Sequence, residues 1–170
     1  GDLRHTDIAK VAAGLRHNKH LDPSLGAVCA YLYASIADID SIRRMAYFYA
    51  SYDQPIPFDI VLLGEMAVTR KDGGDLVVEI PKVPKKNGEK NRELPDFVTQ
   101  GPPATDGIVG GRCPWLGIGW DHIGLIHENA RDLTASIREI SLDVSRAGFT
   151  SFDRATGEHL ARAWGLKRAV

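Results

Sequence analysis

Cysteine and methionine are scarce in this chain, which has two of each among its 170 residues. Cys29 falls on an apolar stripe that is typical of a buried helix face, and Cys113 falls in a loop. Two cysteines so placed do not make the disulfide framework of a small secreted domain. We therefore expect reduced thiols and a cytoplasmic location.

An excess of charge of either sign is also missing. The chain has 21 Lys and Arg against 22 Asp and Glu, a formal net charge of −1. Nucleic-acid-binding proteins usually carry a basic surplus or stripe, so this balance argues against a nucleic-acid partner. A contact through one short basic run is the least favoured of three functional hypotheses, and that run comprises Lys82, Lys85, Lys86, Lys90 and Arg92.

Long hydrophobic runs are absent as well. No stretch reaches the ~20 apolar residues that a transmembrane helix needs, and no signal peptide opens the chain. No membrane partner is therefore expected. The chain starts with Gly1 and Asp2 rather than an initiator Met, and we expect it to be part of a longer protein.

What the chain does have is apolar side chains at helical spacing, most densely over residues 22–66. Asp22 and Pro23 suit the N-cap and first position of a helix. The apolar stripe of this helix consists of Leu25, Val28, Cys29, Leu32 and Ile36. Its i, i+3, i+4, i+7 spacing indicates one buried face.

Two more helices are predicted in the same region. Asp38 or Asp40 is placed to cap the second, which ends at the proline-rich turn over 54–57, because the residue before a proline avoids the α conformation. The third begins at Phe58 and continues to Ala67. Turns this short make antiparallel neighbours of the three helices.

Other segments are predicted with less regular structure. Residues 3–16 are predicted as a modest amphipathic helix, or as a strand leading into one, and a polar connector follows over 16–20. Residues 76–80 form the best strand candidate. Low apolar content over 82–108 predicts a long, exposed and flexible loop.

The last third of the chain returns to helical patterns. A helix held by packing is expected over 115–126, a second over 130–146, and a last one capped by Ser151 or Asp153. The sequence thus predicts one mostly α domain over residues 1–170, a compact bundle of roughly four to six helices. A short strand or hairpin and one long exposed loop complete it.

Six histidines invite a metal site. His17 and His20 lie three residues apart, and His122 and His127 lie five apart. Neither pair has the His-Glu-x-x-His spacing that puts two zinc ligands on one helix face. No metal site is predicted, and because the glycine-rich stretches lack a phosphate-binding pattern, no cofactor is predicted either.

A small cysteine hydrolase is the alternative function. Arg112 precedes Cys113, and a neighbouring cation lowers the pKa of a thiol. His122 or His127 could serve as the base if the fold brought it close. No local motif marks a nucleophile, however, so no catalytic residue is assigned.

The aromatic side chains give the strongest functional indication. Tyrosines crowd the two helices between residues 23 and 52, and two helices cannot bury all of them internally. Because Tyr and Trp dominate interface hot spots, we predict a protein partner. The predicted contact residues are Tyr33, Tyr47, Tyr52, Trp115 and Trp120.

Three phrases of the sequence resemble a known type of region. They are residues 22–26 with the tyrosine-rich helices that follow, residues 55–59, and residues 114–116 with Gly119-Trp120. Together they resemble the helical C-terminal region that bacterial multidomain proteins attach to caspase-like or other protease and effector domains, over residues 20–165. The resemblance implies a non-catalytic accessory or regulatory module, whose partner is a protein or a neighbouring effector domain. No segment matches the caspase-type His and Cys motifs.

Overall fold

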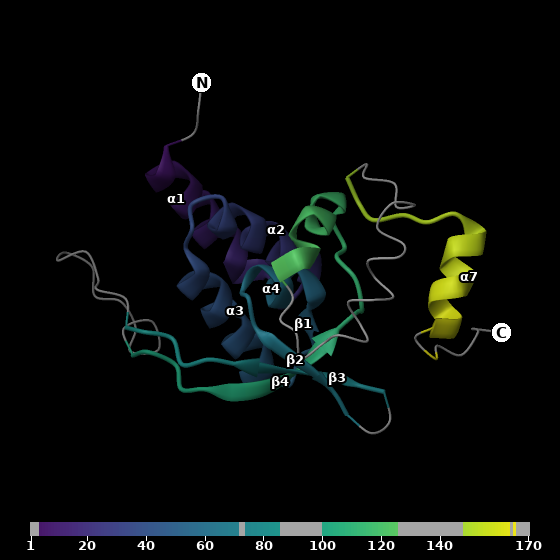
Figure 1. The fold of residues 1–170 in the computed structure, drawn as a ribbon. Helices are drawn as coiled ribbons and strands as arrows, with labels where there is room; N and C mark the ends of the chain where they lie inside the picture. The colour runs from purple at the N-terminus through teal and green to yellow at the C-terminus, as the bar shows by residue number, and fades with distance from the viewer. Residues whose placement is uncertain (1–3, 72–73, 86–99, 126–147, 164, 166–170) are drawn as a thin grey trace.

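The computed structural model describes residues 4–71, 74–85, 100–125, 148–163 and 165. In these residues, helices lie against a four-stranded sheet, and α2, α3 and α4 stand above it in the view of Figure 1. The expectation of a mostly α domain with one short strand or hairpin is therefore wrong. The described chain has a mixed α/β fold.

The predicted N-terminal helices are confirmed. They are α1 (His5–Leu15), α2 (Pro23–Ala34), α3 (Ile39–Ser51) and α4 (Phe58–Leu63), with the 3-10 helix η1 (Arg16–Asn18) after α1. The Asp22 carboxylate caps α2 by accepting from the Ser24 amide at 2.9 Å. Of the two candidates before α3, Asp38 is the cap, because it accepts from the Ser41 amide at 3.0 Å. α4 ends at Leu63, earlier than predicted.

The sheet consists of β1 (Ile56–Pro57), β2 (Ala67–Arg70), β3 (Leu76–Ile80) and β4 (Thr105–Gly110), in the order β1-β4-β3-β2. β1 runs parallel to β4, and the other pairs are antiparallel. β3 confirms the predicted strand. Of β2, only Ala67 falls in a predicted helix, and no element is predicted for residues 68–70. The first part of β4, up to residue 108, falls in the predicted loop. Because β4 pairs on both sides, its ladder bonds outweigh the low strand propensity of its glycines.

The expectation of one exposed loop over 82–108 is wrong at both ends. β4 begins within this range, at Thr105, and lies in the interior of the sheet. Val83 is 0% exposed, and its amide donates to the Pro102 carbonyl at 3.0 Å. Arg44 donates to two further carbonyls of the segment, at 2.7 and 3.3 Å. Residues 86–99 lie outside the described part of the chain.

After β4 the structure describes the 3-10 helix η2 (Gly117–Leu125) and α7 (Arg154–Ala163). η2 occupies most of the predicted helix over 115–126, and its glycines explain why the longer α-helix does not form. Of Ser151 and Asp153, the cap of α7 is Asp153, which accepts from the Thr156 amide at 2.7 Å. The helix expected over 130–146 falls outside the described residues.

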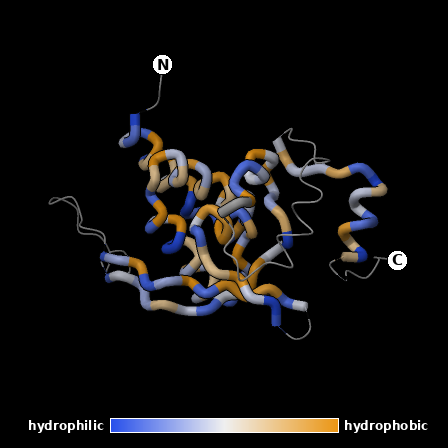
Figure 2. Tube along the Cα trace, in the orientation of Figure 1, coloured by the Kyte–Doolittle hydropathy of each residue, from blue (hydrophilic) through white to orange (hydrophobic). Residues whose placement is uncertain are grey.

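Helices and sheet share one apolar core, which appears as the orange interior of Figure 2. Its largest fully buried side chains include Tyr33, Ile42, Tyr49, Phe58, Ile60 and Ile80. α3 packs closely over β4 at Gly107. A Cβ there would overlap the Ile56 side chain and lie 3.3 Å from the Cβ of Ala50.

We expect Gly107→Ala to lower the free energy of unfolding by about 1–3 kcal/mol, because the added methyl group overpacks this contact. Gly14→Ala is the matched control. No neighbouring atom lies within 4 Å of its Cβ position, and alanine is favoured over glycine in a helix by about 1 kcal/mol. Urea unfolding measures both variants, and equal stabilities would contradict the close packing of α3 on β4.

Candidate functional site

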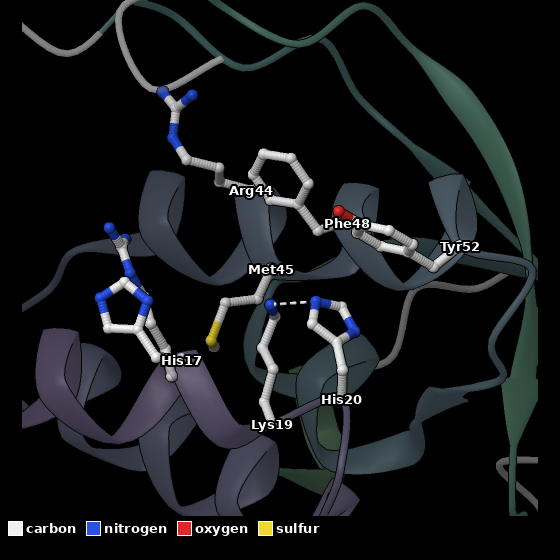
Figure 3. Close-up of a pocket in the computed structure, with 8 residues that line it drawn as sticks. His17, Lys19, His20, Arg44, Met45, Phe48 and Tyr52 are labelled. Carbon is white, nitrogen blue, oxygen red and sulfur yellow. Dashed lines mark hydrogen bonds between the residues drawn. The ribbon is translucent and has the colours of Figure 1, made fainter. Parts of the chain in front are cut away.

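The outer side of α3 carries two adjoining pockets that share Phe48 and Tyr52. The first, named here the basic pocket, has a volume of about 340 Å³ and is shown in Figure 3. Its lining combines basic and apolar side chains: Arg16, His17, Lys19, His20, Arg44, Met45, Phe48 and Tyr52. Among the described residues, no acidic side chain lines this pocket.

The second hollow, named here the tyrosine pocket, has a volume of about 260 Å³. It lies between α3 and the segment that precedes β4, and its lining comprises Tyr47, Phe48, Ser51, Tyr52, Gln100, Gly101, Pro102 and Pro103. The rings of Tyr47 and Phe48 meet edge to face, with centroids 5.5 Å apart. This pocket therefore offers aromatic and proline surface, whereas its neighbour offers positive charge.

Tyr49 fixes the basic pocket in place. Its hydroxyl donates to the Lys19 carbonyl at 2.9 Å, and its ring lies 5.3 Å from the His20 ring, centroid to centroid. A side chain at Gly26 would overlap the Tyr49 hydroxyl, so glycine is needed at this point of α2. The turn that follows η1 is thus held against α3.

Lys19, His20 and Gln54 form a chain of hydrogen bonds. Lys19 Nζ lies 2.6 Å from His20 Nε2, as Figure 3 shows, and His20 Nδ1 lies 2.6 Å from Gln54 Oε1. The Gln54 Nε2 group donates to the His20 carbonyl at 3.3 Å, which fixes Oε1 as the atom facing the ring. Nδ1 therefore carries the hydrogen, and in a neutral ring Nε2 accepts from the Lys19 ammonium.

The Lys19 ammonium sits in a partly desolvated position. Only 6% of the residue is exposed. Burial, and then the nearby Arg16 charge, lower the pKa of Lys19 to about 8. The ammonium also lies 5.6 and 5.7 Å from the ring centroids of Phe48 and Tyr49. These cation–π contacts favour its charged form.

Arg44 lies between this pocket and the backbone at Pro84 and Gln100. It is 2% exposed, and both its terminal nitrogens donate to backbone carbonyls. Its Nε is buried without a hydrogen-bond partner in the described residues. Burial, followed by Arg16, lowers the pKa of Arg44, while Asp40 and Asp38 act in the opposite direction from outside the lining.

The five residues predicted to contact a partner fall into two groups. Tyr52 is 65% exposed and Tyr47 is partly buried, and both line the tyrosine pocket. Tyr33 and Trp120 are 2% and 4% exposed, so they pack in the core and offer little surface. Trp115 is partly buried. Partner binding stays a prediction, and Tyr47 and Tyr52 are the members of the set that share one accessible surface.

A buried carboxylate positions Trp115. Asp59 is 0% exposed and accepts from the Trp115 amide at 2.8 Å, the Leu116 amide at 3.3 Å and the Tyr31 hydroxyl at 2.6 Å. Burial raises the pKa of Asp59, and these hydrogen bonds oppose the rise. Because all three partners donate, the ionised carboxylate is the form that satisfies them.

We expect Asp59→Asn to lower the free energy of unfolding by about 1–3 kcal/mol, because the new NH₂ group must face donors that a carboxylate oxygen accepted. Asp106→Asn, on the exposed side of β4, makes the same chemical change where no buried donor depends on it. Chemical denaturation measures both. A loss at position 59 no larger than that at position 106 would show that the network contributes nothing to stability.

Cys113 is not arranged as an activated nucleophile. Burial, together with the Asp59 carboxylate, raises the pKa of its thiol to about 12, whereas a catalytic cysteine needs a lowered pKa. Of the two candidate bases, His122 lies beside the Tyr31 ring, with centroids 6.3 Å apart. His127 lies outside the described residues. No observation thus favours the hydrolase alternative.

We expect iodoacetamide at pH 7.5 to alkylate Cys113 at least about 100-fold more slowly in the folded chain than in the chain unfolded in guanidinium, because the thiolate fraction falls tenfold for each unit by which the pKa is raised. Mass spectrometry of the labelled peptides gives the rate. Cys29 is an internal control, because burial also raises the pKa of its thiol, to about 11. Its alkylation should therefore be slow in the folded chain as well. Rapid labelling of Cys113 alone would reinstate the hydrolase hypothesis.

Sequence reasoning did not identify the basic pocket. Residues 16–20 were expected as a polar connector, although they hold four basic side chains in five positions. This concentration of basic side chains is the one feature of the sequence that could have indicated the pocket. What the sequence does not show is that Arg44 and Phe48, more than twenty positions later, close the same hollow.

No protein-family model matches the chain, and neither curated proteins nor solved structures yield a match. Within the described ranges, no group of three or more His, Cys, Asp or Glu could hold a metal ion. None of the helices in that part of the chain has the length and apolar character to cross a membrane.

Proposed function

We propose that this chain is a non-catalytic interaction module that binds a protein partner, or a neighbouring effector domain of its parent protein, through the outer side of α3. The binding surface comprises the tyrosine pocket and the rim of the basic pocket. One observation carries the proposal: Tyr52 stands 65% exposed on the wall that separates two hollows.

The surroundings of Tyr52 support this role. Exposed tyrosine presents a rigid apolar ring with a polar tip, and truncation of such residues often removes much of the binding energy of an interface. The Tyr52 ring meets the His20 ring edge-on at 4.8 Å. Leu21, the next residue after His20, is 87% exposed. Apolar surface thus continues from the pockets onto the adjoining turn.

The module is part of a larger effector protein of the cytoplasm. The resemblance to accessory regions of bacterial caspase-like and other effector proteins implies that a separate domain performs the catalysis. Cys29 and Cys113 are both free thiols, which supports the reducing environment of the cytoplasm. In this setting the module would regulate or recruit the effector domain.

Site-specific photo-crosslinking tests the binding surface. The photoreactive residue p-benzoylphenylalanine replaces Tyr52 or Tyr47 in the full-length protein inside its native cells. Ile118 on η2, which is 56% exposed, is the matched control position. We expect the same partner, or the same domain of the parent protein, to be cross-linked from positions 52 and 47 and not from 118, with its identity given by mass spectrometry.

Truncation of Tyr52 to alanine measures how much this side chain contributes to the binding affinity. Tyr52→Ala should weaken binding of the cross-linked partner about tenfold or more, as expected for loss of an interface hot spot. Cross-links of equal yield from all three positions, or from none, would contradict the proposal. So would a Tyr52→Ala variant that binds the identified partner with unchanged affinity.

A further inference from the structure

The basic pocket concentrates positive charge in a chain whose formal net charge is −1. Its five basic lining residues are Arg16, His17, Lys19, His20 and Arg44. The charges are close enough to affect each other, since Arg16 lowers the pKa of both Lys19 and Arg44. A bound anion would relieve this repulsion, because it stabilises the charged form of every nearby cation.

Donors for such an anion are available in the pocket. Lys19 carries three N–H groups, of which His20 takes one. Among the described residues no other acceptor bonds Lys19 Nζ, so two donors remain. His17 is exposed at the mouth of the pocket and adds a further ring nitrogen. Charge-assisted hydrogen bonds to a phosphate or carboxylate are the strongest that such groups make.

The remaining lining is flat and apolar. Met45 and Phe48 project from α3, and Tyr52 from the residue that follows it, on the side facing Lys19 and His20, as Figure 3 shows. A volume of about 340 Å³ is in the range of small-molecule sites. Inorganic phosphate alone would leave this apolar surface in contact with water, whereas a ligand with an apolar body would cover it.

We propose that the basic pocket binds a small organic anion whose phosphate or carboxylate group pairs with Lys19 and His17 and whose flat apolar body packs against Phe48 and Tyr52. The site serves a free small molecule and requires no protein partner. Its test uses the isolated chain, so failure of this inference and failure of the crosslinking proposal are separate results.

Phenyl phosphate is the first probe, and phenylacetate presents a carboxylate instead. Inorganic phosphate lacks the apolar body, and benzyl alcohol lacks the charge. Isothermal titration calorimetry gives the affinities, and backbone amide shifts locate the site. We expect one or both aromatic anions to shift the amides of Lys19, His20 and Phe48, and to bind about tenfold more tightly than either inorganic phosphate or benzyl alcohol.

Matched variants assign the binding to the pocket. Lys19→Met should weaken binding of the aromatic anion about tenfold or more, as expected for a lost charge-assisted hydrogen bond. Lys10→Met, at an exposed position of α1, should leave the affinity unchanged. His17→Glu puts a negative charge at the exposed mouth and should abolish binding without affecting the fold. His5→Glu, which is also exposed and makes the same change of charge, is its control.

Several results would overturn the inference. One is the absence of binding by both aromatic anions to the wild-type chain. Another is equal binding of inorganic phosphate and phenyl phosphate, which would show that the apolar wall takes no part. A third is an equal loss of binding affinity in His17→Glu and His5→Glu. That result would show that the overall charge of the chain, and not the pocket, determines anion binding.

Discussion

The fold depends on satisfying one buried negative charge. Asp59 is the second residue of α4, which directly follows β1. Its carboxylate is stable in the core only with a complete set of donors, since a charge removed from water without partners is strongly destabilising. Those donors come from Tyr31, 28 positions earlier, and from the backbone at Trp115, 56 positions later. α2, α4 and the segment after β4 must therefore assemble together. The close approach of Gly119 to the Tyr31 hydroxyl belongs to the same arrangement.

α3 links this core to the candidate site by using two sides of one helix. On its inner side Ile42 and Ala46 are fully buried, and the helix packs over β4. On its outer side Phe48, together with the C-cap residue Tyr52, lines both pockets. Tyr49 joins the two, because its buried ring carries a hydroxyl that holds the Lys19 turn. A binding surface on such a well-packed helix is largely preformed, so binding costs little conformational entropy.

Local patterns in the sequence predicted those elements that local interactions determine. The helix capped by Asp22 and the strand over 76–80 carry their signals within a few residues. β4 does not, because its glycines favour a strand only when β1 and β3 pair with it on both sides. The candidate site likewise depends in part on contacts between residues that are distant in the sequence. The exposed aromatic surface at Tyr52 was predicted from composition, whereas the basic pocket depends on a contact between η1 and α3 that no local pattern encodes.

The sheet leaves little unpaired backbone at its borders. One border strand, β1, is two residues long and both residues are buried. The other, β2, is four residues long and ends at the exposed Arg70, with exposed Lys71 next. Short borders that carry basic side chains oppose strand addition from a second molecule. At high concentration this part of the chain should therefore resist the intermolecular β-pairing from which fibrils grow, even though its interior strands are rich in valine and isoleucine.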